Sequence, residues 1–223
     1  MSITFSSCFY IIKSKFNHTL YIEWMNHFIS IVNNFYLVIY TDKMSVKDKY
    51  NKETVAELKK IFGFKNNLQT PRIGRVVINV GTGKFLKDAN TVKEIVDAMQ
   101  LIAGQKPVQT KAKKSIAGFK IREGLEVGVK VTLRGKRKWD FIERLVAAAI
   151  PRIKDFQGIK ESTIDTNGNF NLGIKEHVIF PEILPENVKT IFSLQVNIVT
   201  TAKNHKEGLE LFKALKFPMK TKE

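Results

Sequence analysis

The sequence has 223 residues, 43% of them hydrophobic and 16 of them Phe, which excludes a disordered tail and allows a buried core. Its formal net charge of +16 indicates an anionic partner, with a phosphate backbone favoured over an anionic membrane surface. The single cysteine, Cys8, excludes an intrachain disulfide and a zinc site built on cysteines. A reducing compartment fits this composition.

Residues 1–43 differ from the rest of the chain because they carry a net charge of only +1. Their apolar run, 28–40, is too short to span a bilayer. No small-residue cleavage pattern follows Tyr40, which disfavours a signal peptide. We interpret 1–43 as an N-terminal extension outside the native fold and 44–223 as a single α+β domain, with Met44 as the expected native start.

After Met44, the first expected elements are a helix and a strand. Apolar residues at helical spacing predict a helix that Gly63 can end. Pro71 then precedes a predicted strand, 73–80. The apolar positions of the helix are Val55, Leu58, Ile61 and Phe62.

A second helix is predicted after the turn 81–84. Thr91 with Glu94 three residues later forms a capping-box signature, and Gly104 suits the C-terminal end. A short strand is expected at 107–110. The apolar stripe of the helix comprises Val92, Ile95, Val96, Met99 and Ile102.

The second half of the chain begins with a basic loop, followed by a strand over 127–134. A helix over 138–150 should end at Pro151. Its buried face is expected to comprise Trp139, Ile142, Leu145, Val146 and Ala149.

Asn167-Gly168 predicts a hairpin turn between strands at 162–166 and 169–172. A helical turn at 186–190, a strand at 193–201 and a helix capped by Asn204 complete the chain. The core face of this last helix comprises Leu209, Phe212 and Leu215. The order of elements predicts an α+β fold with helices packed on one face of a mostly antiparallel sheet.

Side chains alternate across a strand, so three of the predicted strands each have an apolar face and a polar face. A solvated outer face usually mixes acids with bases, whereas the polar face here has no acid. We therefore expect it to bind RNA through phosphate and 2′-hydroxyl contacts. The apolar positions are Val76, Ile78, Val80, Val129, Val131, Leu133, Leu194, Val196 and Ile198. The opposite positions are Arg75, Val77, Asn79, Lys130, Thr132, Arg134, Gln195, Asn197 and Val199.

The loop 111–122 is basic and contains no acid. Each phosphate that such cations neutralise releases counterions, so we expect salt-sensitive RNA binding by a flexible arm. Phe119, which follows Gly118, is placed to stack on a base or ribose; the alternative is that it belongs to a satellite of the core. The polar loop residues are Lys111, Lys113, Lys114, Ser115, Lys120 and Arg122.

No pattern in the sequence satisfies the requirements of a catalytic or metal site, so we expect neither enzyme activity, nor a metal, nor a cofactor. The run Gly81-Thr82-Gly83-Lys84 fails the phosphate-loop pattern, because Phe85 replaces the hydroxyl residue that would hold Mg²⁺. The four histidines lack ligand spacing, and we interpret His177 as structural.

Several collinear motifs closely resemble the bacterial form of large-subunit ribosomal protein number five, the 5S rRNA-binding protein of the central protuberance. The resemblance covers about residues 44–221. Its motifs are Val-Val-Ile-Asn-Val-Gly-Thr-Gly (76–83), Ile-Ala-Gly-Gln-Lys-Pro (102–107), Thr-Lys-Ala-Lys-Lys-Ser-Ile-Ala-Gly-Phe-Lys-Ile-Arg (110–122), Lys-Val-Thr-Leu-Arg-Gly (130–135), Pro-Arg-Ile-Lys-Asp-Phe-Gln-Gly (151–158), Asn-Phe-Asn-Leu-Gly-Ile-Lys-Glu (169–176), Ile-Phe-Pro-Glu-Ile (179–183) and Val-Thr-Thr-Ala-Lys (199–203).

The resemblance implies a cytoplasmic, structural component of the large ribosomal subunit. It implies that a concave sheet face binds 5S rRNA through Arg75, Asn79, Gln105, Thr132 and Phe119, to which the face analysis adds Lys130 and Arg134. It also implies that the loop 111–122 reaches peptidyl-site tRNA. The further partners it implies are 23S rRNA, the other 5S rRNA-binding proteins and a protein of the small-subunit head, with no membrane.

Two other interpretations stay open from the sequence. An RNA-modifying enzyme could use the basic loop to hold its substrate, but it would need a nucleophile, metal or cofactor motif. A membrane-associated protein could be anchored through residues 1–43.

Overall fold

The computed structural model describes residues 45–86 and 88–220. The expectations for the extension 1–43, for the start at Met44 and for Cys8 lie outside the described residues.

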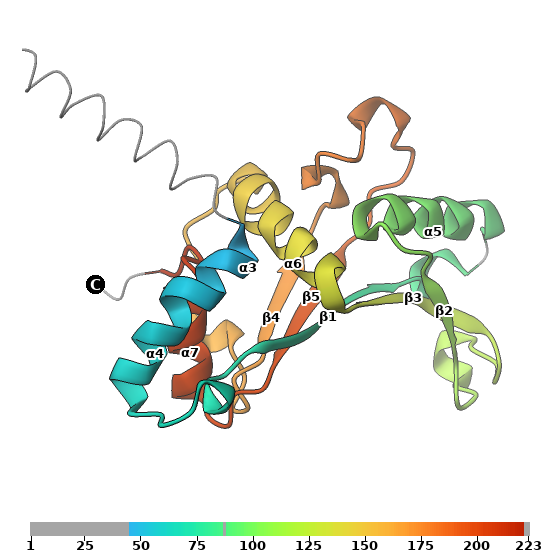
Figure 1. Cartoon of the computed structure of the whole chain (residues 1–223). Helices are drawn as coiled ribbons and strands as arrows, with labels where there is room; N and C mark the ends of the chain where they lie inside the picture. The colour runs from blue at the N-terminus through green and yellow to red at the C-terminus, as the bar shows by residue number, and fades with distance from the viewer. Residues whose placement is uncertain (1–44, 87, 221–223) are drawn as a thin grey trace, which may run out of the picture. The chain divides into compact units, whose positions relative to one another are not determined.

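The described chain is built around one five-stranded antiparallel sheet (Figure 1). Its spatial order is β2-β3-β1-β5-β4, so the first strand in the sequence lies at the centre. The strands are β1 (Ile73–Gly81), β2 (Val108–Lys111), β3 (Glu126–Leu133), β4 (Phe170–Ile174) and β5 (Leu194–Thr200). Together with the helices they confirm the predicted α+β class.

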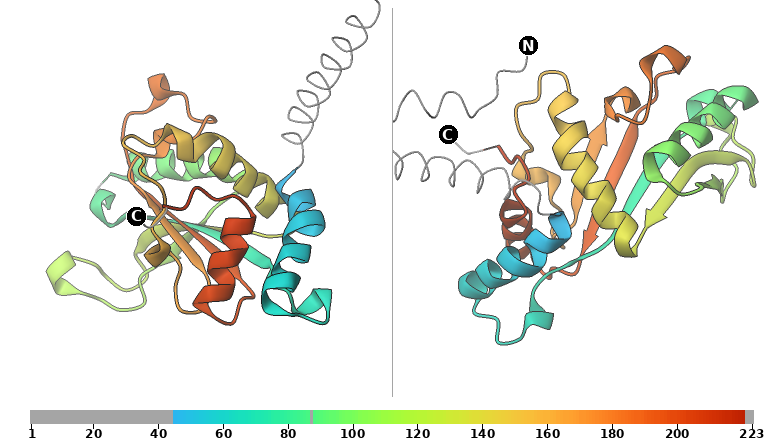
Figure 2. Two further views of the ribbon diagram at one scale, coloured as in Figure 1. Left: turned by 90° about the vertical axis from the view of Figure 1, so that its left-hand side faces the viewer. Right: turned by 45° about the horizontal axis from the view of Figure 1, so that its top comes forward.

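Within residues 45–86 and 88–220, helices cover one face of this sheet and leave the centre of the other face without a helical layer. α5 (Ala89–Ala103) and α6 (Gly135–Arg144) lie over the strands on the same side (Figure 2, right). At one end of the sheet, α3 (Val46–Lys49) and α4 (Val55–Phe62) lie beside α7 (His205–Ala214). We call the face opposite α5 and α6 the open face.

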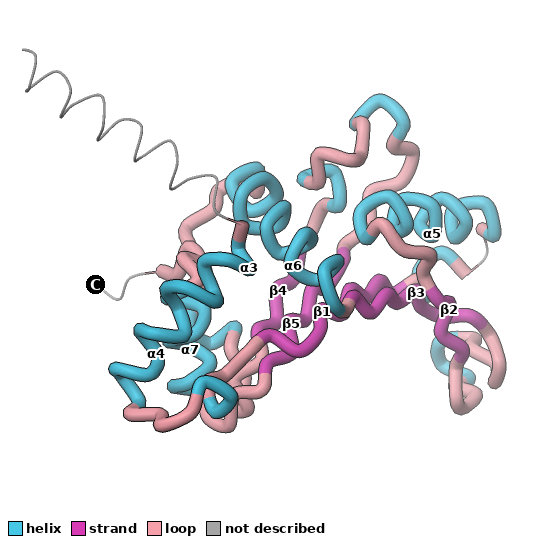
Figure 3. Tube along the Cα trace, viewed as in Figure 1, coloured by secondary structure: helices cyan, strands magenta, loops and turns pink. Residues whose placement is uncertain are grey.

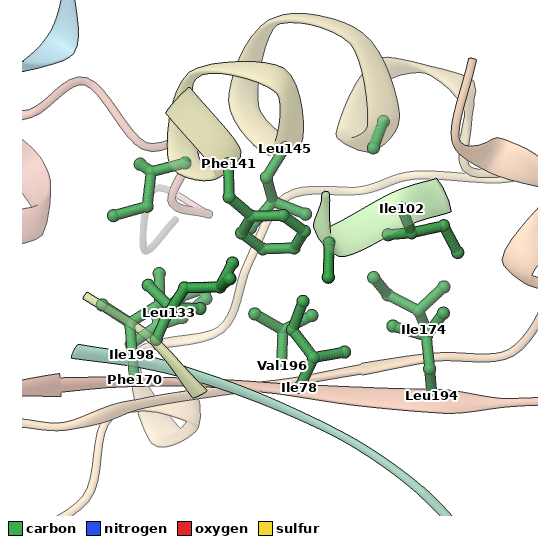
Figure 4. Close-up of a cluster of buried hydrophobic side chains, with 14 of the residues drawn as sticks. Ile78, Ile102, Leu133, Phe141, Leu145, Phe170, Ile174, Leu194, Val196 and Ile198 are labelled. Atoms are coloured by element: carbon green, nitrogen blue, oxygen red, sulfur yellow. The ribbon is translucent and has the colours of Figure 1, made fainter. Parts of the chain in front are cut away.

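The core lies between the covered face of the sheet and the helices. Phe141 and Leu145 point from the α6 side toward Ile78 and Val196 on the strands (Figure 4). All four side chains are fully buried. At the α7 end, the rings of Phe170, Phe212 and Phe217 have centroids 5.0–5.3 Å apart. These contacts confirm the apolar faces predicted for β1, β3 and β5.

The start of β1 is irregular, with a register shift between Ile73 and Arg75 against β5. The ammonium of Lys138 on α6 donates to the backbone carbonyls of Ile73, at 2.5 Å, and Gly74, at 3.3 Å. Burial lowers the pKa of Lys138, and the nearby charge of Arg72 lowers it further. Lys138 thus fastens the irregular end of the central strand to the helical layer.

Two predicted glycine ends are confirmed, but two other helix boundaries are wrong. Gly63 and Gly104 both end their helices in the left-handed conformation. Thr91 is not the N-cap of α5, because the helix already begins at Ala89 with Asp88 before it. The helix predicted over 138–150 begins earlier, at Gly135. It continues as a π-helical turn (Leu145–Ala149) and ends close to Pro151 as predicted, with only a 3-10 turn (Ile150–Arg152) after it.

The predicted hairpin before β4 is also corrected. Its first arm is a 3-10 turn (Glu161–Thr163) with a single bridge between Ile164 and Phe170. The carboxylate of Asp165 accepts the backbone N–H groups of Asn167 and Asn169, which closes the turn without a strand. β4 instead pairs along its length with β5.

Two smaller expectations are modified. The helical turn expected at 186–190 is a 3-10 turn at Pro185–Asn187. Trp139 is only partly buried and lies against Tyr50, with 5.5 Å between ring centroids.

Candidate nucleic-acid interface

The open face is built from cross-strand rows of polar side chains. Residues opposite each other in an antiparallel pair point to the same face, so the register defines each row. The first row runs through Val108, Lys130, Asn79, Gln195 and Gly173, one residue from each of the five strands. It brings together two predicted site residues, Lys130 and Asn79, from neighbouring strands.

A second row runs parallel to the first and comprises Thr132, Val77, Asn197 and Asn171. The side-chain amide of Asn197 donates to the side-chain carbonyl of Asn171. Asn171 was missed by the sequence analysis, which assigned its strand to a local hairpin. The alternation of Phe170, Leu172 and Ile174 with Asn171 and Gly173 is the signal that could have placed it on this face.

The open face also contains cations without acidic neighbours in the rows. Arg75 and Lys130 are exposed, as is Arg134, which directly follows β3 and precedes α6. Among residues 45–86 and 88–220, no ion pair involves these three side chains. Glu126, the first residue of β3, lies beyond the two rows and opposite Lys111 of β2. Three cations are thus left to attract an anionic ligand.

The loop 111–122 joins β2 to β3 and projects on the side of the sheet away from α5 and α6 (Figure 3). Backbone hydrogen bonds in both directions between Ile116 and Ile121 close its tip. The hydroxyl of Ser115 donates to the carbonyl of Ile121 at 3.1 Å. The tip is therefore an internally hydrogen-bonded turn. Its lysines, Lys111, Lys113, Lys114 and Lys120, and Arg122 are all exposed.

Phe119 lies at this tip and is 75% exposed. It is the last residue of a 3-10 turn, Ala117–Phe119, and precedes Lys120, which is in the left-handed conformation. This exposure excludes the alternative that Phe119 belongs to a satellite of the core. The ring is free to contact a ligand.

Gln105 does not lie in the rows of the open face. It follows the end of α5, and its side-chain carbonyl accepts a hydrogen bond from Arg137 of α6 at 3.2 Å. Gln105 therefore contacts the helical layer and does not share the rows that contain Asn79 and Thr132.

Two other kinds of feature were expected to be absent from the sequence or left open by it, a metal site and a membrane span. In residues 45–86 and 88–220, no group of three or more His, Cys, Asp or Glu side chains is arranged to hold a metal. The helices found in the same residues are too short or too polar to cross a bilayer. His177 is buried against Phe192, which agrees with its interpretation as a structural residue.

Residues 66–122 match the model described as ribosomal protein L5, and residues 126–219 match the model of the C-terminus of the same ribosomal family. The large ribosomal subunit protein uL5 of Colwellia psychrerythraea is 46% identical over 175 residues, which cover 78% of this chain and 97% of that protein. The chain belongs to the ribosomal protein L5 family. The resemblance of the sequence motifs to this family is thereby confirmed.

The two matches of the L5 family fall on different parts of the interface. The match over 66–122 contains β1, β2 and the basic loop, whereas the match over 126–219 contains β3, β4 and β5. Both rows of the open face therefore combine residues from the two matched segments. Membership in this family also makes the chain a ribosomal protein without enzymatic activity, as expected.

Proposed function

We propose that this protein is a structural component of the large ribosomal subunit that binds 5S rRNA with the open face of its sheet. The chain is a ribosomal protein by its family, and its bacterial relative is named as a protein of the large subunit. The proposed binding surface consists of the two rows that contain Asn79, Lys130 and Thr132, together with the cations Arg75 and Arg134.

The observation that carries this proposal is the pair of cross-strand rows, which contain amides, a hydroxyl and a lysine but no acid. Lysine and arginine attract phosphates, while amides and hydroxyls pair with 2′-hydroxyl groups and base edges. A face that only had to be solvated would gain nothing from excluding acids.

The same proposal assigns the polar residues of the loop 111–122 to peptidyl-site tRNA, while Phe119 stays with 5S rRNA. The loop extends from the end of the sheet, and its cations are exposed, so a second RNA can reach them. The remaining partners implied by the family resemblance are 23S rRNA, the other 5S rRNA-binding proteins and a protein of the small-subunit head. The proposed location is the ribosome in the cytoplasm.

The test is a binding titration of the full-length chain with 5S rRNA of the same organism. We expect tight binding that weakens steeply with salt, and much weaker binding to an arbitrary RNA duplex of equal length. Equal affinity for the two RNAs would reduce the open face to a general polyanion-binding surface and contradict the proposal.

A further inference from the structure

The inside–outside pattern of β1 changes at the start of the strand. From Val76 to Val80 the side chains alternate between the core and the open face. Ile73 is also buried in the core, although it precedes Val76 by an odd number of residues. Regular alternation would place two such positions on opposite faces. An extra residue must therefore separate Ile73 from Val76 in the strand.

That extra residue is Gly74, which forms a β-bulge. Ile73 lies opposite Thr200 of β5. Arg75, two residues later, lies opposite Val199, which directly precedes Thr200, so β1 has one residue more than its partner here. Gly74 and Arg75 are consecutive and both exposed. The bulge thereby turns Arg75 to the open face while Ile73 stays in the core.

The carbonyls of the bulge are held by Lys138 of α6. Backbone groups at a bulge leave the regular ladder and need other partners. The ammonium of Lys138 lies 2.5 Å from the carbonyl oxygen of Ile73 and 3.3 Å from that of Gly74. The same ammonium lies 5.3 Å from the centroid of the Trp139 ring, a cation–π contact that helps to keep the lysine in place.

The residues just before the bulge are fixed as well. The hydroxyl of Tyr50 donates to the carbonyl of Pro71 at 3.1 Å. The backbone N–H of Thr201 donates to the carbonyl of Arg72 at 2.9 Å, and the hydroxyl of Thr201 accepts the N–H of Arg72 at 3.0 Å. With the two carbonyls held from α6, every carbonyl of residues 71–74 has a donor.

The charge of Lys138 is unfavourable where it stands. Burial lowers the pKa of Lys138 and the nearby charge of Arg72 lowers it further, so both disfavour the ammonium form. Among the described residues, 45–86 and 88–220, no carboxylate forms an ion pair with this lysine. Its donors are directed at the two carbonyls of the bulge instead, which indicates that holding the bulge is its role.

We propose that Lys138 is a positioning residue for RNA binding, because by holding the bulge it directs Arg75 onto the open face. Arg75 contacts a phosphate, and Lys138 acts only through Arg75. Without the donor from α6, the carbonyls of the bulge lack a partner and the start of β1 loosens from β5. Arg75 then loses its fixed direction. This inference rests on the proposed function and adds to it the residue that orients one of its cations.

A double-mutant cycle on the full-length chain tests the inference. The affinity for 5S rRNA and its salt dependence are measured for Arg75→Gln, for Lys138→Met and for the double variant. Lys138→Met keeps a long side chain but removes its donors and its charge. Lys136→Met is the matched control, because Lys136 is an exposed cation on the same helix. Thermal melting verifies that each variant is folded.

We expect Arg75→Gln and Lys138→Met each to weaken binding about tenfold to a hundredfold, the effect of losing one hydrogen bond to a charged group. Each should also reduce the slope of log affinity against log salt by about 0.7–0.9, the value for one lost phosphate contact. In the double variant these effects should not add, because Lys138 acts through Arg75. Lys136→Met should bind nearly as the wild type does.

A conservative variant and a measurement without RNA complete the test. Lys138→Arg should restore affinity and salt dependence, because a guanidinium can donate to two carbonyls at once. In the free protein, a nuclear Overhauser contact between Arg75 and Val199 should be seen in the wild type and in Lys138→Arg but not in Lys138→Met. If Lys138→Met does not fold, Lys138→Gln replaces it, and the same lack of additivity with Arg75→Gln is expected.

Additive effects of Lys138→Met and Arg75→Gln would overturn the inference and make Lys138 an independent RNA contact. Persistence of the contact between Arg75 and Val199 in Lys138→Met would overturn it as well. Failure of the wild-type chain to bind 5S rRNA would instead refute the proposed function. In that case the measurement on the free protein still decides whether Lys138 directs Arg75.

Discussion

The imidazole of His177 stacks on the ring of Phe192, with 3.9 Å between centroids and an interplanar angle of 9°. The backbone N–H of Phe192 also donates a hydrogen bond to His177 Nδ1, with 3.4 Å between the two nitrogens. Because Phe192 directly precedes Ser193 and β5, this contact fastens the segment after β4 to the start of β5. Burial lowers the pKa of His177.

This relationship predicts a pH dependence of stability. The pKa of His177 is lower in the folded chain than its ordinary value of about 6.5. At a pH between the folded pKa and this ordinary value, the unfolded chain therefore binds more protons than the folded chain. The free energy of unfolding should therefore fall as the pH drops below about 6.5, and the loss should level off below the folded pKa. Thermal melts at about pH 7.5 and about pH 5.5 measure it.

His177→Gln should be less stable at neutral pH but should lose less stability on acidification than the wild type. His205→Gln is the control, since His205 lies on α7 away from this contact. An equal effect of acid on His177→Gln and the wild type would assign the pH dependence to other groups.

Asn79→Ala and Thr132→Ala should weaken 5S rRNA binding without unfolding the protein. Each side chain is partly exposed on the open face, and loss of one hydrogen bond costs about 0.5–1.5 kcal/mol. Binding isotherms measured beside thermal melts test this. Asn90→Ala on the exposed surface of α5 should leave the affinity unchanged. A large drop in melting temperature for either variant would show that the side chain stabilises the fold instead.

Replacing both Lys113 and Lys114 with Gln should weaken peptidyl-site tRNA binding to reconstituted ribosomes while sparing 5S rRNA binding. The slope of log affinity against log salt for 5S rRNA should stay almost unchanged, because the proposal assigns these cations to the second RNA. Lys130→Gln should reduce that slope by about 0.7–0.9, the value expected for one lost phosphate contact. A larger change of slope in the loop variant than in Lys130→Gln would reverse the assignment.

Gly208→Ala should destabilise the protein, although alanine normally stabilises a helix interior by about 1 kcal/mol relative to glycine. A Cβ at this position would lie 2.5 Å from Gly168 Cα and 2.7 Å from Gly168 O. Overpacking of this kind costs about 1–3 kcal/mol. Chemical denaturation measures the change, with the exposed Lys206→Ala on the same helix as control. A more stable Gly208→Ala variant would mean that α7 can move away from the turn at Gly168.

The faces of β1, β3 and β5 could be predicted because burial on one side imposes a period of two on the sequence. Gly63 and Gly104 could be predicted as helix ends because a left-handed residue is a local requirement. Asn171 was missed because the local Asn167-Gly168 signal indicated a hairpin and outweighed the alternation of residues 170–174, whereas the partner of β4 lies farther along the chain.

The hollow beside the tip of the basic loop was not predictable for a related reason. It is lined by Lys84, Phe119 and Ile191, which no local pattern connects. The turn at 81–84 was recognised as a feature, but only the tertiary structure shows which side chains face it. Gln105 likewise depends on a contact with Arg137 that sequence spacing does not reveal.

Because β1 lies at the centre of the sheet, its strand pairing can be completed only late in the synthesis of the chain. Val77 pairs with Thr132 on one side and with Asn197 on the other, so β1 is translated early but gains its second neighbour only when nearly the whole chain has emerged. Until then one edge of the central strand stays unpaired and open to aggregation. Any product truncated before Leu194 keeps that exposed edge and should therefore aggregate. It also lacks Gln195 and Asn197, so neither row of the open face is complete.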